Sequence, residues 1–158
     1  MFSNSSNDYV FKSAQFHLHQ PSEHTINGKS YPLELHIVHV LDHPSITEYL
    51  VIGLLFEVDS TLTYDFLDYV KIHGTTAETH LFPFPVTNKA AYHYLGSLTT
   101  PPCTEAVNWF LQAEPIKITQ AHMDELTARV GNGKINNRQV QALKSRPVYL
   151  VGQGCSSQ

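Results

Sequence analysis

The chain has 158 residues, of which 42% are hydrophobic and 15% charged, as is typical of one globular domain with a substantial core. Its 10 basic and 14 acidic residues give a formal net charge of −4, and no run of Lys or Arg offers a basic surface to nucleic acids or anionic membranes. The longest apolar stretch, residues 49–56, is far shorter than the about 20 residues of a membrane-spanning helix. Intrinsic disorder is excluded by the abundant aromatic and β-branched residues, and we expect neither a nucleic-acid nor a membrane partner.

Hydrophobic patterning predicts a chain built mainly of β-strands. The first segment alternates between apolar and polar residues, and the Asn27-Gly28 turn signal separates it from the next strand. The third segment is apolar almost throughout, as expected for a strand buried on both faces of a sheet. The expected strands are residues 9–19, 33–40, 48–58, 92–95 and 106–111.

Two helices are expected at the periphery of the sheet. Residues 66–72 form a candidate short helix, and Thr119 is a favourable N-cap for a second helix that Gly131 ends. The sequence contains no internal repeat. It therefore predicts a single domain over residues 1–158, mainly β with peripheral α, in which residues 1–8 are disordered.

The 10 histidines are the most informative part of the composition. His17 and His19 lie two residues apart on an expected strand, so both side chains leave the same face, and His36 lies in the middle of the next strand. Consecutive strands are often neighbours in a sheet, so a third imidazole can approach the first two. Three neutral imidazoles would hold Zn²⁺ with one coordination position open, which is the catalytic rather than the structural arrangement.

Residues in phase with these histidines strengthen the zinc hypothesis. A metal-bound imidazole usually has its second nitrogen hydrogen-bonded to an oxygen. Gln15 shares the face of the first two histidines, and Glu34 and Val38 share the face of His36, where Val38 would supply an apolar wall. The alternative is an ordinary surface pair of histidines, since most His-x-His sequences bind no metal. His39 points away from His36, and we assign no role to His43, His73, His80, His93 and His122.

Five blocks of sequence are far more specific together than any one of them alone. They are Gln15-Phe16-His17-Leu18-His19, Ser22-Glu23-His24-Thr25, Glu34-Leu35-His36-Ile37-Val38-His39, the long run Tyr94-Leu95-Gly96-Ser97-Leu98-Thr99-Thr100-Pro101-Pro102-Cys103-Thr104-Glu105 with Trp109, and Asn136-Asn137-Arg138 with Gln141 and Leu143.

In this order, over residues 9–151, the sequence resembles the α-class carbonic anhydrases, and residues 21–25 are most similar to bacterial members. The resemblance implies a central mixed, largely antiparallel sheet that lacks the family's N-terminal strands. It implies that zinc supports the reversible hydration of carbon dioxide to bicarbonate, and that sulfonamides inhibit the reaction. A homo-oligomer that pairs through the exposed sheet edge at residues 9–19 is also expected, because the strands that cover this edge in the family are missing.

The resemblance also implies a role for each matching residue. Thr99 would orient the attacking hydroxide through its hydroxyl oxygen and pass its own proton to Glu23. The zinc ligands would be His17, His19 and His36, supported by Gln15, Glu34 and Asn136, and carbon dioxide would lie against Val38, Val51, Leu98, Thr99, Thr100 and Trp109.

Each of these residues has an ordinary structural alternative, and the chain has alternative functions. The Thr-Thr-Pro-Pro run alone would be a loop, Val51 and Trp109 alone would be core residues, and Glu23 alone would be a cap or a surface carboxylate. The chain could be a catalytically silent carbonic-anhydrase-like protein that serves as a binding or structural module. A third reading is a truncated product with intact chemistry and poor folding. The complete ligand set favours retained metal binding.

The sequence departs from the family before residue 9, where a substantial segment is expected. That segment normally supplies the proton-shuttle histidine, so we expect turnover to depend on added buffer. It also supplies the usual disulfide partner of Cys103, which here can stay reduced, pair with Cys155 or link two chains. The sequence shows no export signal, although the resemblance implies a periplasmic or secreted protein if a longer precursor exists.

Overall fold

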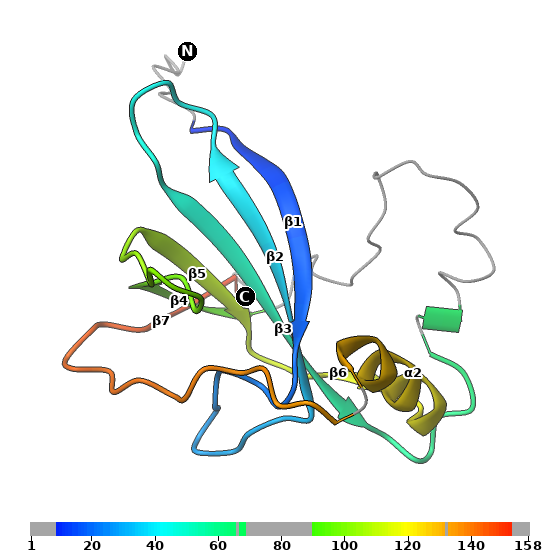
Figure 1. Cartoon of the computed structure of the whole chain (residues 1–158). Helices are drawn as coiled ribbons and strands as arrows, with labels where there is room; N and C mark the ends of the chain where they lie inside the picture. The colour runs from blue at the N-terminus through cyan, green and yellow to red at the C-terminus, as the bar shows by residue number, and fades with distance from the viewer. Residues whose placement is uncertain (1–8, 66, 69–89, 132, 153–158) are drawn as a thin grey trace, which may run out of the picture.

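The structure is a computed structural model that describes residues 9–65, 67–68, 90–131 and 133–152. It contains a seven-stranded sheet with the order β1-β2-β3-β5-β4-β7, in which β6 extends the sheet by pairing with β3 (Figure 1). The elements are β1 (Phe11–His19), β2 (Leu33–Leu41), β3 (Tyr49–Val58), β4 (Ala91–Gly96), β5 (Val107–Gln112), β6 (Ile116–Ile118), β7 (Tyr149–Val151) and the helix α2 (Gln120–Val130).

The sheet is mixed and largely antiparallel. β1 pairs with β2, β2 with β3, and β4 with both β5 and β7, all in antiparallel fashion. β3 is parallel to β5 and to β6. The expected fold class is therefore confirmed, and each of the five expected strands is present with small shifts at its ends. The two additional strands, β6 and β7, have only three residues each, too few to show an alternating pattern.

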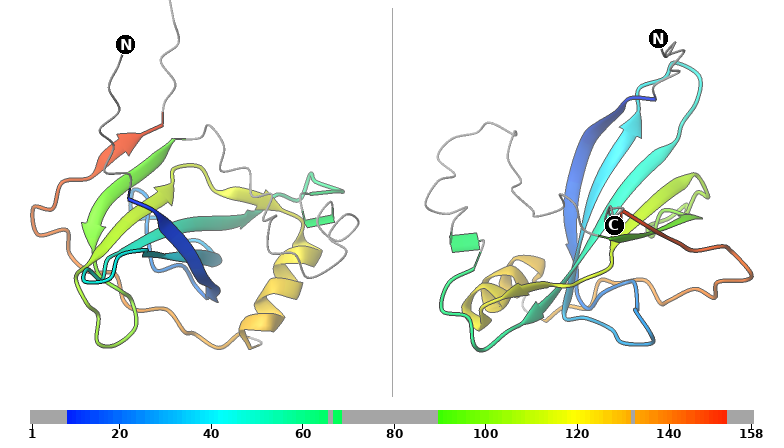
Figure 2. Two further views of the ribbon diagram at one scale, coloured as in Figure 1. Left: turned by 90° about the horizontal axis from the view of Figure 1, so that it is seen from above. Right: turned by 180° about the vertical axis from the view of Figure 1, so that it is seen from behind.

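The two faces of the sheet have different coverings. On one face, Leu33 and Leu35 of β2 pack with Leu54 and Phe56 of β3 and with Met123 of α2. The helix lies at the end of the sheet where β3 and β6 run side by side (Figure 2). Successive side chains of a strand point to opposite faces of the sheet. The side chains of residues 15, 17 and 19 of β1 and of residues 34, 36 and 38 of β2 therefore lie on the other face, which α2 does not cover.

The helix α2 begins and ends where the sequence predicts. The hydroxyl of Thr119 accepts a hydrogen bond from the His122 backbone N–H, which is the expected N-cap. Gly131 follows the helix with φ 115°, a left-handed conformation that glycine adopts without strain. Of the other expected helix, at 66–72, only Leu67 and Asp68 are described, and both are helical.

Several expectations concern residues outside the described ranges. These are the disorder of residues 1–8, the roles of His73 and His80, and the disulfide state of Cys155. Cys103 is half-buried and forms no disulfide within the described part of the chain. No helix among the described residues is both long and apolar enough to cross a membrane.

Candidate metal centre and its surroundings

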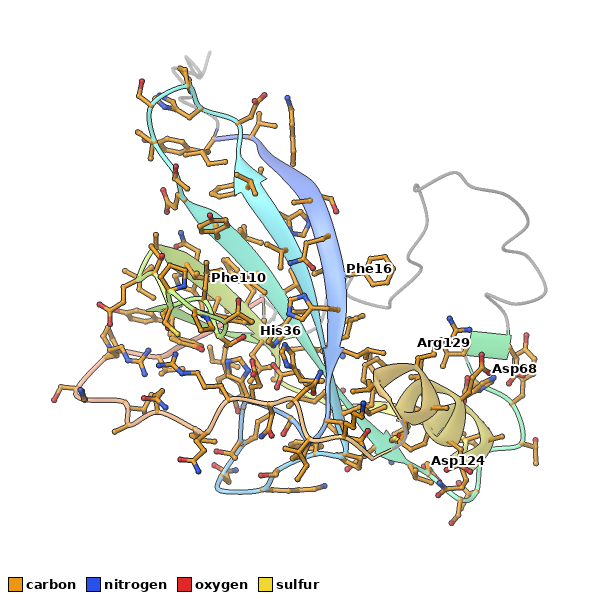
Figure 3. The ribbon with its side chains drawn as sticks, viewed as in Figure 1. Phe16, His36, Asp68, Phe110, Asp124 and Arg129 are labelled. Atoms are coloured by element: carbon orange, nitrogen blue, oxygen red, sulfur yellow. The ribbon has the colours of Figure 1, made fainter. Side chains whose placement is uncertain are left out.

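Three imidazoles converge on the face of the sheet that α2 leaves free. The antiparallel register places His17 of β1 directly opposite His36 of β2, and His19 follows two residues later on the same face. The ring centroids lie 4.7 Å (His17–His19), 5.2 Å (His17–His36) and 4.5 Å (His19–His36) apart. One nitrogen from each ring can be chosen so that all three lie within 4.8 Å of one another. Figure 3 shows His36 on this side of the sheet and Phe16 projecting from the other.

Two of the imidazoles have one nitrogen held by a neighbouring oxygen. His17 donates from Nδ1 to Gln15 Oε1 at 2.8 Å. His36 donates from Nε2 to Glu34 Oε1 at 2.7 Å, in a pair whose side chains are almost completely buried. Each bond fixes the tautomer of its ring, so that the opposite nitrogen carries a lone pair. Gln15 and Glu34 thus lie where the zinc hypothesis needs them.

The third imidazole shows the clearest sign of a missing partner. His19 Nδ1 faces the backbone carbonyl of Asn136 at 3.4 Å, while His19 Nε2 is buried with no hydrogen-bond partner. The side chain of Asn136 holds the C-terminal segment against β1 by accepting from the Gln20 N–H and donating to the Leu18 carbonyl. An unsatisfied buried nitrogen is costly in a folded protein. Because this nitrogen belongs to the ring beside the lone pairs of His17 and His36, the residues present fit a bound divalent metal.

Burial favours the neutral form of two of these imidazoles, His17 and His19. Burial, together with the neighbouring rings of His36 and His19, lowers the pKa of His17 to about 4. The pKa of His19 is lowered by burial first and by His36 second. Neutral imidazoles are the form that binds metal, so the cluster is ready to bind at neutral pH.

Glu34 is the centre of a hydrogen-bond network behind the cluster. Its Oε2 accepts from the backbone N–H groups of Glu23 (2.8 Å) and His24 (2.9 Å), and its Oε1 accepts from the rings of His24 and His36. Burial alone would raise the pKa of Glu34, but the charge and hydrogen bond of His24 and the contact with His36 hold it far below its ordinary value. Glu34 is therefore a carboxylate that can accept from both rings.

His24 and Tyr94 belong to this network and were missed by the sequence reasoning. His24 Nε2 lies 2.7 Å from the Tyr94 hydroxyl, and the pKa of Tyr94 is raised by burial and by the charge of Glu34. The tyrosine thus keeps its proton, and its hydroxyl lies within hydrogen-bond distance of the His24 ring. Both residues lie inside the recognised sequence blocks, but only the folded chain shows that they connect to His36 through Glu34.

Glu23 and Thr99 line one cavity, but the hydrogen bond implied between them is not formed. Glu23 Oε1 accepts from the Arg138 N–H at 2.6 Å, and Oε2 is buried 3.9 Å from His36 Nδ1 with no hydrogen-bond partner within the described part of the chain. Glu23 Oε1 also lies 3.3 Å from His19 Nδ1. The structure thus leaves a buried carboxylate oxygen that lacks the donor which the Thr99 hydroxyl was expected to provide.

The apolar residues expected to contact carbon dioxide lie together, but the expected polar residue Thr100 does not join them. Val38, Val51 and Trp109 form one buried cluster, and Leu98 packs against it. The Trp109 ring centroid lies 4.8 Å from that of His36, and its indole N–H donates to the Ser97 carbonyl at 3.1 Å. Thr100, in contrast, is exposed in the turn before the two prolines.

Gly53 keeps space open behind the cluster. It lies opposite His36 in the register of β2 and β3. A Cβ at this position would come within 3.0 Å of the Leu111 side chain and 3.2 Å of Glu34 Oε1. The glycine therefore allows Glu34 to lie flat against the sheet beneath the imidazoles.

His122 has a structural contact that the sequence did not suggest. It is buried at the start of α2, where its Nδ1 lies 2.8 Å from Asp65 Oδ2. Asp65 Oδ2 also accepts from the Thr119 N–H at 2.7 Å, so it joins the 59–65 segment to the N-terminus of the helix. This arrangement explains the burial of His122.

A β-sheet carrying this histidine cluster defines a candidate metalloenzyme, and comparison with known proteins gives its family. A family profile described as eukaryotic-type carbonic anhydrase matches residues 2–152. The chain belongs to this family, the α-class carbonic anhydrases.

Individual relatives agree with this assignment. A carbonic anhydrase of Neisseria gonorrhoeae is 34% identical over 148 residues, which cover 90% of this chain and 57% of the relative. The α-carbonic anhydrase of Thermovibrio ammonificans, solved with the inhibitor sulfanilamide, is 34% identical with a TM-score of 0.69, covering 87% of this chain and 62% of that one. Dioscorin, solved with ascorbate, is 25% identical with a TM-score of 0.71, covering 96% and 66%. The chain thus spans about half the length of the curated relatives it matches, for example 57% of one and 38% of another.

Proposed function

We propose that the chain binds Zn²⁺ through His17, His19 and His36 and catalyses the reversible hydration of carbon dioxide to bicarbonate. The observation that carries the proposal is the convergence of three imidazoles, one of which has a buried nitrogen with no hydrogen-bond partner. Bound zinc would lower the pKa of a coordinated water to about 7, which makes hydroxide available at neutral pH. Membership of the carbonic anhydrase family supports this assignment of the reaction.

The side chains around the cluster have separate tasks in this proposal. Gln15, Glu34 and the Asn136 carbonyl hold the three rings in the tautomer that faces the metal. Val38, Val51 and Trp109 give carbon dioxide an apolar surface beside His36.

Thr99 and Glu23 would control the orientation of the attacking group. Donation from the Thr99 hydroxyl to the buried Glu23 Oε2 would leave the threonine oxygen able only to accept. The proton released in each hydration step would pass to solvent or buffer.

A specific observation favours a second candidate, a zinc-binding module without turnover. The Thr99–Glu23 hydrogen bond is not formed, and Glu23 Oε2 is buried with no hydrogen-bond partner. Mispositioning of a reacting group by about 1 Å can reduce a rate about a hundredfold. A silent protein would keep the metal and the fold but lose the catalytic geometry.

One set of measurements on the purified full chain separates these candidates. Zinc content is measured by plasma mass spectrometry, hydration of carbon dioxide by stopped flow, and inhibition with sulfanilamide. One equivalent of zinc with sulfanilamide-sensitive hydration supports the proposal, whereas zinc without hydration supports the silent module. The variant Thr99→Val should keep zinc but lose hydration, with Thr61→Val in an exposed turn as the matched control. Absence of zinc after metal reconstitution would overturn both candidates.

We also propose that two copies pair through β1. This strand is at the edge of the sheet, and among the described residues only β2 pairs with it. β1 contains one lysine, Lys12, and an irregularity between Ser13 and Gln15, but it has no proline and no acidic residue, so its charge gives little protection against edge pairing. An antiparallel β1–β1 pair about a two-fold axis would satisfy the outer backbone groups and continue the sheet into the second copy.

A further inference from the structure

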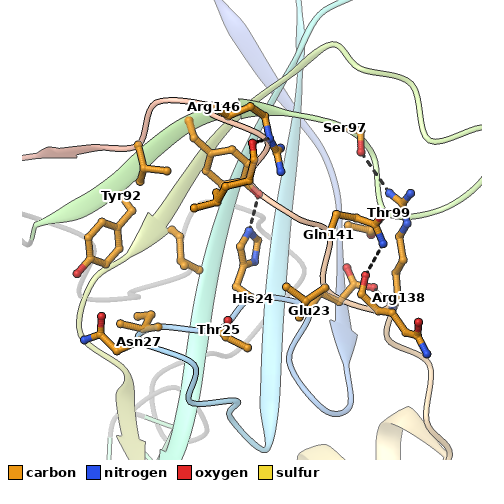
Figure 4. Close-up of a pocket in the computed structure, with 17 residues that line it drawn as sticks. Glu23, His24, Thr25, Asn27, Tyr92, Ser97, Thr99, Arg138, Gln141 and Arg146 are labelled. Atoms are coloured by element: carbon orange, nitrogen blue, oxygen red, sulfur yellow. Dashed lines mark hydrogen bonds between the residues drawn. The ribbon is translucent and has the colours of Figure 1, made fainter.

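A cavity of about 380 Å³ lies between the sheet and the segment that leads from Arg138 to Val148 (Figure 4). The three clustered histidines do not line it, although Glu23 and Thr99 form part of its wall. The volume is within the range of about 300–1,000 Å³ typical of small-molecule sites. The cavity therefore adjoins the candidate metal centre, with which it shares Glu23 and Thr99, and is large enough for a ligand that does not contact the three histidines.

Two half-buried arginines line this cavity, and neither forms an ion pair within the described part of the chain. Arg146 lies over the Tyr94 ring, 5.4 Å from its centroid, and donates from Nε and Nη2 to backbone carbonyls of residues 143 and 142. Arg138 donates from Nη1 to Ser97 Oγ at 3.3 Å. These contacts hold both guanidinium groups in place and leave further N–H donors on each. Two fixed cations without a carboxylate partner form a suitable site for an anion.

The only carboxylate among the described lining residues does not neutralise this site. Glu23 is buried, and its Oε1 already accepts from the Arg138 backbone N–H, with His19 Nδ1 at 3.3 Å. It belongs to the metal centre rather than to the arginine side chains. The lining thus has two cationic side chains and one carboxylate, whose Oε1 faces the Arg138 backbone N–H and the His19 ring.

Part of the remaining wall of the cavity is apolar. Leu111 of β5 and Tyr92 of β4 line the sheet side, and Leu143 and Val148 line the opposite side. Leu143 is 56% exposed and Val148 42% exposed, so both present apolar surface to solvent. A ligand with an apolar body would cover this surface while its charged end met the arginines.

We propose that this cavity binds a small organic carboxylate with an apolar body. The carboxylate lies at Arg138 and Arg146, and the apolar body packs on Leu111 and Leu143. The site lies beside the proposed zinc centre and does not include its three histidines.

Isothermal titration calorimetry with benzoate tests the site directly. Sulfate supplies charge without an apolar body, and benzyl alcohol supplies the body without the charge. Each titration is made on the full chain as purified, with and without saturating sulfanilamide. We expect benzoate to bind equally with and without sulfanilamide, and at least about tenfold more tightly than sulfate or benzyl alcohol, since each charge-assisted hydrogen bond contributes about 1.5–3 kcal/mol. Loss of benzoate binding in sulfanilamide would overturn the proposal, as would sulfate or benzyl alcohol binding as tightly as benzoate.

Substitutions of residues that line the cavity test whether benzoate binds there. Arg146→Gln and Arg138→Gln should each weaken benzoate binding about tenfold or more, whereas Arg129→Gln, on the exposed side of α2, should leave it unchanged. If an arginine variant unfolds, as judged by circular dichroism, Leu143→Gln provides the decisive measurement because Leu143 is largely exposed. If Leu143→Gln and every arginine variant that folds bind benzoate as tightly as the wild-type chain, benzoate binds elsewhere and the proposal is overturned.

Discussion

His36 and Glu34 lie two residues apart on the same face of β2, and the His36 ring donates from Nε2 to Glu34 Oε1 while both side chains are almost fully buried. This contact sets the tautomer of His36, because a carboxylate can only accept. The same carboxylate holds His24 and the backbone of the 23–24 turn, so one acid organises the rear of the metal centre.

The variant Glu34→Gln tests this dependence. The amide cannot accept from all of these donors and carries no charge, so His36 should lose its fixed orientation. We expect zinc affinity to fall about 10- to 100-fold. Competition with a fluorescent chelator measures the affinity, and Glu57→Gln, whose side chain pairs with Lys29 at the far end of β3, is the control. Unchanged affinity in Glu34→Gln would show that the contact does not support the metal site.

The dependence of zinc binding on pH follows from the neutral imidazoles. With the pKa of His17 near 4 and that of His19 lowered by burial, protons compete weakly with the metal above pH 6. Zinc affinity should change little between pH 8 and about pH 6, beyond any contribution from the coordinated water, and should fall as the pH approaches the pKa of His17. Chelator competition at a series of pH values measures this. A steep loss of affinity centred near pH 6.5, the ordinary value for histidine, would contradict it.

The turnover rate is expected to depend on buffer. His17, His19 and His36 are assigned to the metal, and His24 is bonded at both ring nitrogens. A buffer base must then accept the proton released in each cycle. Stopped-flow hydration in 5 to 100 mM imidazole-type buffer at constant ionic strength should show a rate that rises with concentration. A flat response with a high rate would mean that a group of the chain itself exports the proton.

The sequence predicted the parts of this protein that depend on strand alternation and on familiar motifs. The facing of His17 and His36 followed from two adjacent strands with histidines in phase, and the structure has that register. The role of His24 could not be predicted, because it depends on a turn that brings both ring nitrogens to partners 10 and 70 residues away in sequence. β6 and β7 were missed because three residues cannot display a period of two. The absence of a hydrogen bond between Thr99 and Glu23 likewise depends on side-chain placement that no motif specifies.

The edge pairing of β1 is tested by placing a charge on the strand. Ala14 is exposed and lies at the irregularity between Ser13 and Gln15, so Ala14→Lys should fold normally and bring two lysines together across the two-fold axis. Light scattering should show a dimer for the wild-type chain. For the variant, the dissociation constant of the dimer should be at least about tenfold higher. Ala128→Lys, on the exposed surface of α2, is the control. A monomeric wild-type chain at high concentration would contradict the proposed pairing.

The contact between Asp65 and His122 should stabilise the fold in a pH-dependent way. Burial alone would raise the pKa of Asp65, but its hydrogen bonds with the Thr119 N–H, His122 and the Leu67 N–H hold it below its ordinary value near 3.8. The carboxylate therefore contributes stability above that value and loses it as the pH falls further. Asp65→Asn should reduce the free energy of unfolding at pH 7 by about 1.5–3 kcal/mol, with the difference from wild type shrinking below pH 4. Urea unfolding of both proteins at pH 7, 5 and 3 measures this, and Asp124→Asn on α2 is the exposed control. An equal difference at pH 7 and pH 3 would show that the charge of Asp65 is not what stabilises the contact.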